Sequence, residues 1–437
     1  MRFGTDGIRG VANAQLTPEL ALAIGRAAAR VLGGPVITVG RDPRWSGPML
    51  EAAFVAGACA EGVSVELLGV VPTPAVALRS ETANCPAAMI SASHNPFGDN
   101  GIKLFAPGGL KLSDEVQALL EAELDAAGAK ADAPTGRDVG TVGTYDVAPD
   151  YVRHVGESIP DGALAGLKVV LDCGNGASSD VASTVFTRLG AEVVALHVTP
   201  DGSNINDASG STHPESLRTA VVAEGAQLGF AFDGDADRML AVDHQGRLID
   251  GDQLIAVAAV DLKRRGLLVN DTVVVTVMSN LGFRIGMAAE GIEVVDTAVG
   301  DRYVLEALDQ GGHVLGGEQS GHIIFRDRAT TGDGVLSAVV IAEIVARTGR
   351  PLADLADAAM TRLPQVLRNV RIQAPMPDVT DRIADELTAA AAALGADGRV
   401  LVRPSGTEPV VRVMVEAVDA TTAQQWCDHL VQVVETL

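Results

Sequence analysis

Three aspartates stand at alternate positions in the segment FDGDADR, directly after the apolar run AQLGFAF. Asp233, Asp235 and Asp237 would repel one another in so short a loop unless a cation neutralised them. Carboxylate oxygens are hard ligands that suit Mg²⁺ or Ca²⁺. An EF-hand is excluded, because its sixth and twelfth positions require Gly and Glu, whereas Arg238 and His244 stand there. The segment predicts a divalent-cation site, with a solvated acidic turn as the less favoured alternative.

A second polar segment, SASHNPFGDNGIK, offers a nucleophile. It carries Ser91, Ser93 and His94 before an Asn-Pro corner, and Lys103 at its end. A serine exposed on a tight loop can carry a phosphoryl group covalently. The alternative is an ordinary loop of turn-forming residues. A metal loop elsewhere in the chain makes that alternative less favoured, because a phosphoserine would bridge to the metal.

Two further loops carry groups that suit a sugar phosphate. In GGEQSGH, the residues Glu318, Ser320 and His322 alternate, so an extended loop would point all three side chains the same way. Carboxylate and hydroxyl groups suit sugar hydroxyls. The loop RPSGTEP offers a phosphate cradle without a Walker lysine, and a plain hairpin turn is the alternative for this loop. The cradle residues are Arg403, Ser405, Gly406, Thr407 and, on the next strand, Arg412.

Three stretches of the chain share the same order of strands and helix-like segments. In each stretch, the third strand would position one of the polar loops. Each stretch begins with a β-branched strand, written PVITVG, LKVVLD or TVVVTV, and passes through a helix-like segment to a second strand. A third strand then ends in ISASHNP, FDGDADR or GGEQSGH. Strands that alternate with helices predict parallel α/β units, whose ligands bind at the carboxyl ends of the strands.

The remainder of the chain has a different rhythm of strand, helix, strand, strand and helix, which predicts a small α+β unit. The expected fold is therefore α/β: three similar mixed α/β domains in tandem plus a small C-terminal α+β domain, arranged around a central cleft. We expect the domains to carry the serine, metal, sugar and phosphate loops in that order. Their predicted ranges are 1–148, 149–248, 249–364 and 365–437.

Composition limits the classes of partner. The net charge of −23 argues against a nucleic-acid partner and an anionic membrane surface, although a local cluster of Arg and Lys could still hold a small anion. Four scattered cysteines without a C-x-x-C pair fit a reducing compartment. No apolar run reaches the ~18 residues of a membrane span, and the first ten residues do not form a signal peptide. We expect a cytoplasmic location.

Taken together, the loops resemble those of the α-D-phosphohexomutase family. FGTDGIRG, ISASHNPFGDNGIK, FDGDADR, GEQSGH and RPSGTEP stand in that family's order over nearly the whole chain. One such motif would be a hint, whereas five in order are specific. Gln319 in GEQSGH is typical of the family's glucosamine branch, and the glucose and mannose branches usually have Met there. The resemblance implies a four-domain, heart-shaped arrangement.

The resemblance also implies a role for each loop. Ser93 rather than Ser91 would be the phosphoserine and, with the three aspartates, a ligand of Mg²⁺. Glu318 and Ser320 would contact sugar hydroxyls, and the RPSGTEP residues with the following strand would grip the phosphate that does not react. Lys103 and His322 are the expected proton carriers. The residues expected at the reacting end are Arg9, His94, Lys103, Arg238 and His322.

The implied activity is an isomerase reaction that interconverts glucosamine 6-phosphate and glucosamine 1-phosphate through a phosphoserine enzyme and a 1,6-bisphosphate. It would feed UDP-N-acetylglucosamine and cell-wall synthesis. The expected partner is a hexosamine phosphate, with no nucleic acid or membrane, and the chain would be a monomer or homodimer. Alternatives are a glucose or mannose phosphate mutase, a phosphatase with an aspartate nucleophile, which FDGDAD and TGDGV could imitate, and a sugar-phosphate sensor. The phosphatase leaves SASHNP and RPSGTEP unexplained, and the sensor does not need a serine beside three aspartates.

Overall fold

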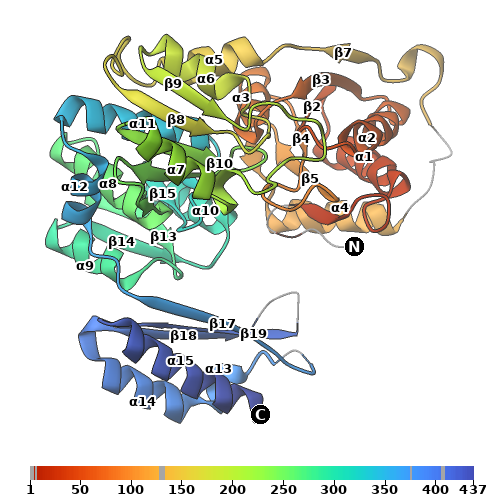
Figure 1. Cartoon of the computed structure of the whole chain (residues 1–437). Helices are drawn as coiled ribbons and strands as arrows, with labels where there is room; N and C mark the ends of the chain where they lie inside the picture. The colour runs from red at the N-terminus through yellow and green to blue at the C-terminus, as the bar shows by residue number, and fades with distance from the viewer. Residues whose placement is uncertain (1–3, 5–6, 127–132, 375, 405–408) are drawn as a thin grey trace. The chain divides into compact units, whose positions relative to one another are not determined.

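The computed structural model describes residues 4, 7–126, 133–374, 376–404 and 409–437 of the 437-residue chain. The chain divides into two compact units. The first consists of Met1–Val277 and Ile292–Ala356, and the second of Met278–Gly291 and Asp357–Leu437. Among the described residues, the first unit contains three β-sheets and the second contains one (Figure 1). None of the described helices is both long and apolar enough to cross a membrane.

The same three-stranded arrangement recurs in the three sheets of the first unit. Within their sheets, the strands run in the orders β3-β2-β4, β9-β8-β10 and β14-β13-β15, and every neighbouring pair in these triplets is parallel. The predicted threefold α/β repeat is therefore confirmed. The strands are β2 (Val36–Arg41), β3 (Ser64–Val70), β4 (Ala87–Ile90), β8 (Lys168–Asp172), β9 (Glu192–Leu196), β10 (Leu228–Phe232), β13 (Thr272–Thr276), β14 (Glu293–Thr297) and β15 (Leu315–Gly317).

An antiparallel strand follows the third strand of each triplet, which the sequence did not predict. These strands pair with β4, β10 and β15, respectively, and they are β5 (Asp99–Ala106), β11 (Met239–Asp243) and β16 (Ile323–Phe325). The reversal leaves a short loop at the carboxyl end of each third strand. These three loops carry Ser93, the three aspartates and Glu318, so each motif occupies the equivalent junction of its own sheet.

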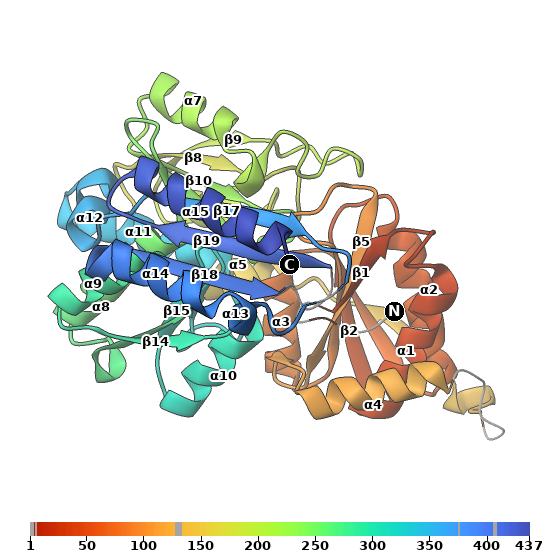
Figure 2. The same ribbon diagram turned by 90° about the horizontal axis from the view of Figure 1, so that it is seen from below.

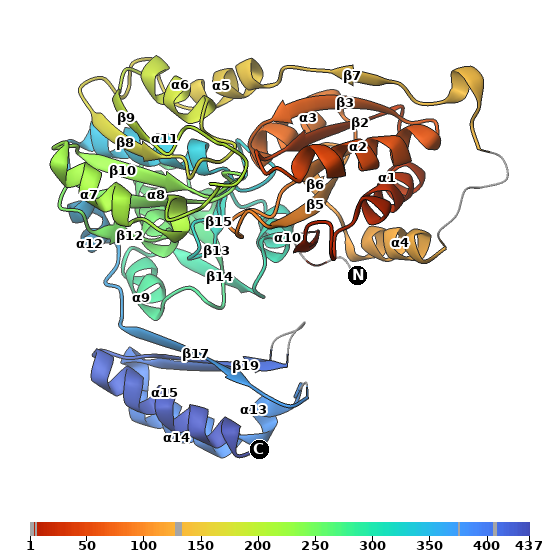
Figure 3. The same cartoon turned by 45° about the vertical axis from the view of Figure 1, so that its right-hand side comes forward.

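Helices cover the first sheet, and α1 and α2 lie side by side against it (Figure 2). A Cβ on Gly25 of α1 would lie 2.1 Å from the carbonyl oxygen of Phe54 in α2, so glycine is required for this close approach. Strand β7 forms an edge of the sheet beside β3 (Figure 3). The remaining elements here are α1 (Pro18–Leu32), α2 (Gly47–Ala60), α3 (Thr73–Ala83), α4 (Asp114–Asp125), β1 (Ile8–Val11), β6 (Leu110–Lys111) and β7 (Val142–Thr144).

Helix α11 (Gly334–Thr348) is the central helix of the first unit. Every residue from Gly334 to Val345 is buried, and the helix contacts β10, β11 and β16 as well as α5 and α8. The apolar run in this helix is therefore core of the unit. The other helices of this part of the chain are α5 (Ala148–Gly156), α6 (Val181–Arg188), α7 (Glu215–Ala223), α8 (Gly251–Arg264), α10 (Asp301–Gly311) and α12 (Leu352–Ala359), and a short strand, β12 (Leu248–Ile249), precedes α8.

The second unit contains the predicted α+β structure. Its sheet is antiparallel in the order β17-β19-β18, and α13, α14 and α15 pack on one face over a core of valines (Figure 1). The first strand begins at Gln365, four residues before the expected NVRIQA segment. The elements are α9 (Leu281–Ala289), β17 (Gln365–Arg371), α13 (Val379–Arg382), α14 (Ala384–Leu394), β18 (Arg399–Pro404), β19 (Val410–Glu416) and α15 (Ala420–Glu435).

Candidate active site

Ser93 lies at the junction between β4 and β5 with its backbone in the left-handed region, at a φ of 55°. Its side chain is fully buried, whereas the sequence predicted an exposed serine. The hydroxyl donates to Oδ2 of Asp233 over 2.5 Å and lies 3.3 Å from Nδ1 of His94. The serine loop and the aspartate loop, 140 residues apart in the chain, therefore meet at this hydroxyl.

Arg44 contacts the serine loop, and no motif in the sequence indicated this role. Its side chain is fully buried and forms an ion pair with Asp42, with 2.8 Å between Nε and Oδ2. Its Nη atoms donate to the carbonyl oxygens of Ser93, Asn95, Pro96 and Asp99. Because a backbone carbonyl cannot move while it accepts from a buried guanidinium, Arg44 fixes the left-handed turn at Ser93.

Ser91 has a structural place in the same network. Its hydroxyl donates to Oδ2 of Asp42 over 2.7 Å and accepts from the backbone N–H of Ser93 over 2.8 Å. Burial raises the pKa of Asp42, while Arg44 and Ser91 favour the charged carboxylate. Ser93, not Ser91, is thus the serine whose hydroxyl meets the aspartate loop.

Two residues of the second repeat lock the serine loop onto the aspartate loop. Asn206 donates through Nδ2 to the carbonyl oxygen of Ser93 over 2.9 Å. Gly234 lies so close that a Cβ there would sit 2.6 Å from the same oxygen. Any side chain at position 234 would separate the two loops. Neither contact was predicted, because each joins segments that are distant in the chain.

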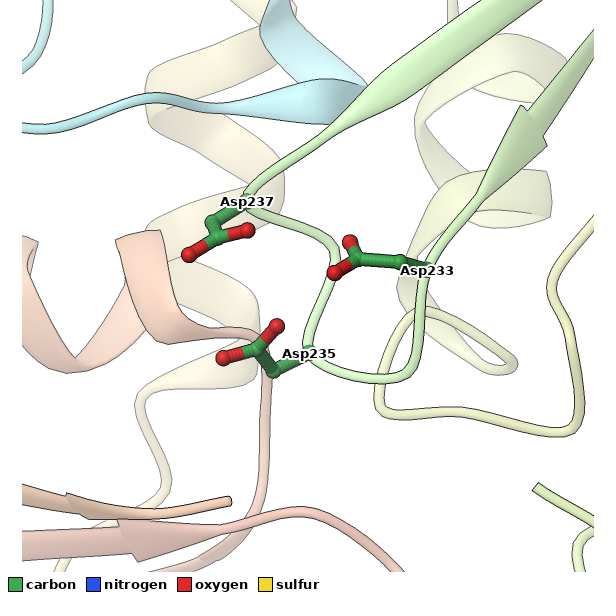
Figure 4. Close-up of side chains that lie close together, drawn as sticks. All are labelled: Asp233, Asp235 and Asp237. Carbon is green, nitrogen blue, oxygen red and sulfur yellow. The ribbon is translucent and has the colours of Figure 1, made fainter. Parts of the chain in front are cut away.

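The three aspartate carboxylates face a common space (Figure 4). One oxygen of each lies within 4.8 Å of the others, and all three side chains are buried. Oδ1 of Asp235 and Oδ1 of Asp237 have no hydrogen-bond partner in the part of the chain that the structure describes. A buried carboxylate oxygen without a donor is unfavourable, and a cation would satisfy it. A buried set of hard oxygen donors fits a divalent metal ion.

The surroundings shift the pKa values of Asp233 and Asp237 in opposite directions. Burial, together with Asp237 and Asp235, raises the pKa of Asp233 to about 8. Burial also opposes a charge on Asp237, but Lys103, His322 and Arg238 hold its pKa well below the usual range. Without a cation, Asp233 therefore holds a proton that a bound metal would displace.

Lys103 on β5 reaches directly into the cluster. Its Nζ lies 2.7 Å from Oδ2 of Asp235 and 2.8 Å from Oδ2 of Asp237. Thr73 at the start of α3, which the sequence did not indicate, donates its hydroxyl to the same oxygen of Asp235 over 2.7 Å. The structure thus places Lys103 against the proposed metal ligands, where it offsets part of their negative charge.

His94 is a hydrogen-bond acceptor beside the serine. Burial, Arg238 and Arg9 lower its pKa to about 4, so the imidazole is neutral near pH 7. Its Nδ1 lies 3.3 Å from the Ser93 hydroxyl and 3.4 Å from Nη1 of Arg238. Arg9 stands on β1 opposite Gly101 of β5, at the same end of the sheet. The structure thus gathers four of the five residues expected at the reacting end around Ser93 and the aspartates.

The extended conformation predicted for the loop GGEQSGH is wrong. The N–H of Gly321 donates to the carbonyl oxygen of Glu318, and the N–H of Glu318 donates to that of His322, which closes a tight turn between β15 and β16. Gly321 has a φ of 90°, which a glycine adopts without strain. As a result Ser320 is exposed while His322 is buried.

His322, the fifth residue, also lies against the cluster. Its Nδ1 is 3.8 Å from Oδ1 of Asp237, and its Nε2 is 3.8 Å from Oδ2 of Asp301. Burial lowers the pKa of the ring, but the carboxylates of Asp237, Asp301 and Glu318 outweigh burial and raise it. The N–H of Gly332 donates to Nε2 over 3.2 Å, a contact that requires this nitrogen to lack a proton.

In the second unit, two arginines face each other across strands. Arg403 on β18 pairs in register with Arg412 on β19. Nε of Arg403 is buried without a hydrogen-bond partner among the described residues, and burial together with Arg412 lowers its pKa. Two neighbouring cations of this kind favour an anion between them. Ser405, Gly406 and Thr407 lie outside the described residues.

A pocket of about 380 Å³ adjoins Arg412 on the face of the sheet that the helices leave open. Its lining also includes Asn369 and Arg371 of β17. Asn369 stands in register with Arg412, so Asn369, Arg412 and Arg403 form one row across all three strands. The pocket beside this row is lined by Arg371 and Arg412 and is large enough for a phosphate group.

Models of known protein families match four stretches of the chain. Four family models match it, and their descriptions read phosphoglucomutase/phosphomannomutase alpha/beta/alpha domains I, II and III and C-terminal domain. The matched residues are 1–131, 149–246, 250–363 and 357–433, respectively. Together these matches cover most of the chain.

Curated relatives match over nearly their full length. The phosphoglucosamine mutase of Streptomyces avermitilis is 54% identical, over 99% of this chain and 98% of its own. The phosphoglucosamine mutase of Pelotomaculum thermopropionicum is 51% identical, over 100% of this chain and 99% of its own.

Solved structures show the same fold. A phosphoglucomutase/phosphomannomutase family protein from Burkholderia thailandensis matches with a TM-score of 0.81 and 29% identity, over 99% of this chain and 97% of its own. The Aspergillus fumigatus N-acetylphosphoglucosamine mutase, solved with GlcNAc-6P and magnesium, matches with a TM-score of 0.72 over 99% of this chain and 95% of its own. Its 18% identity shows a shared fold alone.

Proposed function

This chain belongs to the phosphoglucomutase/phosphomannomutase family, and from that premise we propose that it is a phosphoglucosamine mutase. It is an isomerase that interconverts glucosamine 6-phosphate and glucosamine 1-phosphate, which supplies the precursor of UDP-N-acetylglucosamine. Relatives with that name that are more than half identical over the full length support the substrate. The observation that carries the mechanism is the hydrogen bond between the Ser93 hydroxyl and Asp233 at the edge of a buried carboxylate cluster.

Ser93 is the phosphoryl carrier of this reaction. The phosphoserine transfers its phosphoryl group to a sugar hydroxyl: the hydroxyl proton passes to a base, the bond between the Ser93 oxygen and phosphorus breaks, the Ser93 oxygen takes up a proton, and a 1,6-bisphosphate forms. The Ser93 hydroxyl then gives its proton to a base and attacks the phosphorus at the other end of the sugar, and the sugar oxygen released there takes up a proton. His94 is neutral and its Nδ1 lies 3.3 Å from the serine hydroxyl, so its ring flanks the nucleophile in this second step.

Asp233, Asp235 and Asp237, with an oxygen of the phosphoserine, hold Mg²⁺. Magnesium is supported by the hard, buried donor set and by the magnesium bound to the related Aspergillus enzyme. When bound, the ion supplies charge stabilisation to the phosphoryl group in transfer. Lys103 and Arg238 lie against the same carboxylates and add positive charge at this end of the site.

We assign the proton transfer to His322 rather than Lys103. The ammonium group of Lys103 is held in ion pairs with the carboxylates of Asp235 and Asp237. The His322 ring lies between two carboxylates and accepts at Nε2 from Gly332, so it has a nitrogen able to exchange a proton. Arg9 lines the reacting end beside His94.

The remaining groups bind the sugar hydroxyls and the phosphate that does not react, which is called the distal phosphate. Glu318 and Ser320 contact sugar hydroxyls from the turn between β15 and β16. Arg403 and Arg412, together with residues 405–407, grip the phosphate that does not react. Because the bisphosphate must bind in two orientations, this grip must serve either phosphate of the same sugar. Nε of Arg403 is buried and has no hydrogen-bond partner among the described residues, which supports an anion at this position.

The proposal also covers the domain boundaries, the oligomeric state and the cellular location of the protein. We divide the chain into domains 1–148, 149–248, 249–364 and 365–437, and we propose a monomer or homodimer. All four cysteines are free thiols, which supports a reducing, cytoplasmic location.

The test is turnover of glucosamine 6-phosphate, glucose 6-phosphate and mannose 6-phosphate side by side, with Mg²⁺ and a trace of hexose 1,6-bisphosphate. We expect glucosamine 6-phosphate to lead in kcat/KM. A lead of glucose or mannose 6-phosphate would keep the mutase mechanism and replace the substrate. Release of free phosphate alone would favour the phosphatase.

A further inference from the structure

The segment TGDGV follows β16 and opens helix α11, and no role has so far been given to it. In this segment, residues 332–334 lie against two parts of the active site at once. The N–H of Gly334 donates to the carbonyl oxygen of Ala236 over 3.0 Å, and the N–H of Gly332 donates to Nε2 of His322 over 3.2 Å. We name residues 332–334 the bracket, because they contact both the aspartate loop and the His322 ring.

The bracket supports a strained residue between two proposed metal ligands. Ala236 has a φ of 55°, which is unfavourable for a residue with a Cβ, and it stands between Asp235 and Asp237. Its turn sets the directions of those two carboxylates, which face each other in Figure 4. A strained turn persists only when its surroundings hold it, and the Gly334 hydrogen bond holds its carbonyl oxygen.

The bracket also leaves no room for side chains toward the site. A Cβ on Gly332 would lie 2.4 Å from the His322 ring, and a Cβ on Gly334 would lie 2.5 Å from the carbonyl oxygen of Arg238. The hydrogen bond from Gly332 fixes Nε2 as the acceptor, so the proton of the neutral ring sits on Nδ1. That nitrogen faces Asp237.

Asp333, the middle residue of the bracket, points away from the active site. Its side chain is buried, and its Oδ1 accepts from the N–H of Leu336 over 2.9 Å, which caps α11. The same oxygen accepts from the hydroxyl of Tyr151 over 2.7 Å. Tyr151 is fully buried on α5, 182 residues earlier in the chain.

We propose that Tyr151 and Asp333 are positioning residues of the reaction: they fix the bracket, and the bracket holds the aspartate loop and the His322 ring in their working geometry. The role of the bracket in turnover rests on the proposed mutase function. The effect of the bracket on the metal site and on the His322 tautomer does not depend on that function. Tyr151 touches neither the aspartates nor His322 in any contact of the structure, so its influence passes through Asp333.

Tyr151→Phe tests the proposal, because it removes one hydroxyl and keeps the ring. Tyr145→Phe is the matched control: the Tyr145 hydroxyl also donates to a carboxylate, Asp150, over 2.5 Å, but away from the bracket. Mg²⁺ affinity is measured by titration calorimetry on the dephosphorylated full chain, and kcat and KM are measured separately. We expect Tyr151→Phe to weaken Mg²⁺ binding about tenfold and to lower kcat about tenfold, with KM changed less than about twofold.

The His322 ring gives a readout that a general loss of stability would not change. At a pH above the raised pKa of the ring, where the imidazole is neutral, the ¹⁵N resonances of His322 should show the Nδ1-protonated tautomer in wild type and in Tyr145→Phe, and a mixture of tautomers in Tyr151→Phe. Asp333→Asn keeps an acceptor oxygen for the cap and should stay near wild type, whereas Asp333→Ala should resemble Tyr151→Phe or exceed it.

The proposal is overturned if Tyr151→Phe lowers only the melting temperature, with Mg²⁺ affinity, kcat and the His322 resonances as in Tyr145→Phe. It is also overturned if Asp333→Asn and Asp333→Ala bind Mg²⁺ equally. Should the wild-type chain show no mutase activity, the proposed function fails, but the calorimetric and NMR measurements still decide whether the bracket holds the site.

Discussion

Arg44→Met should damage both the stability of the first unit and the phosphorylation of Ser93. The substitution keeps an unbranched apolar stem but removes a buried cation that binds Asp42 and four backbone carbonyl oxygens. Removing one partner of a buried ion pair destabilises proteins by about 3–5 kcal/mol, because the other charge stays buried without compensation. The lost carbonyl contacts belong to the same group, so we do not add them to this value.

The pH dependence of this loss separates the ion pair from mere packing. Burial raises the pKa of Asp42, and Arg44 is the largest influence that opposes the rise. Without Arg44 the folded-state pKa rises further. A carboxyl with a raised folded pKa contributes stability below its unfolded pKa and loses it as the pH rises through the folded pKa. The deficit of Arg44→Met should therefore be smallest at acidic pH and grow toward neutral pH.

The assay compares Arg44→Met with Arg41→Met, which removes an arginine that is 22% exposed and is paired with Glu51 over 3.3 Å. We expect Arg41→Met to lose no more than about 1 kcal/mol. Thermal unfolding across pH reports stability, and intact-mass measurement after addition of glucose 1,6-bisphosphate reports the rate of Ser93 phosphorylation. If the two variants unfold alike and Arg44→Met is phosphorylated at the wild-type rate, the assigned role of Arg44 is refuted.

Three other predictions concern single groups. Ser93→Ala should reduce turnover by more than about 10³-fold, by analogy with the loss of other covalent nucleophiles, and near-normal activity in a coupled assay would exclude the phosphoserine mechanism. Arg403→Ala should raise KM about tenfold or more with a smaller change in kcat, because it removes a charged fork from the distal phosphate; a KM equal to that of wild type would disprove that contact. The pKa of Asp333 is raised to about 6 by burial, so its contribution to stability is full below about pH 4 and is lost as the pH rises through about 6. Asp333→Asn should lack this loss in thermal unfolding between pH 4 and 7, and identical pH slopes for the two proteins would contradict the shift.

Local pattern predicted the repeat and the polar loops correctly, because each depends on short runs of residues. Apolar strands and polar junctions can be read within ten positions, as at β10 and the aspartates that follow it. The antiparallel strands β5, β11 and β16 were not predicted, since an apolar run does not reveal the direction in which it pairs. The turn at Glu318 was missed because alternation was read as extension, although Gly321 could have signalled a turn.

The support of the site could not be predicted, because it depends on contacts across the chain. The sequence gives no reason to bury Arg44 under a loop that begins nearly fifty residues later, or to pair Tyr151 with Asp333. The burial of Ser93 has the same origin, since the aspartate loop of another repeat covers it. Residue types thus indicated the chemistry, while the groups that hold it in place became visible only in three dimensions.

After β4, β10 and β15, different residues determine stability and specificity: the paired strands stabilise each sheet, and the loop between them carries the residues that determine specificity. In each sheet the ladder between the third strand and its antiparallel neighbour sets the register, so the loop between them does not have to. Each sheet therefore holds a loop with a different set of reactive groups. Substitution within one loop leaves the strand pairs of the other two sheets intact, so a chain built this way can change the sugar that it binds without changing the residues that transfer the phosphoryl group.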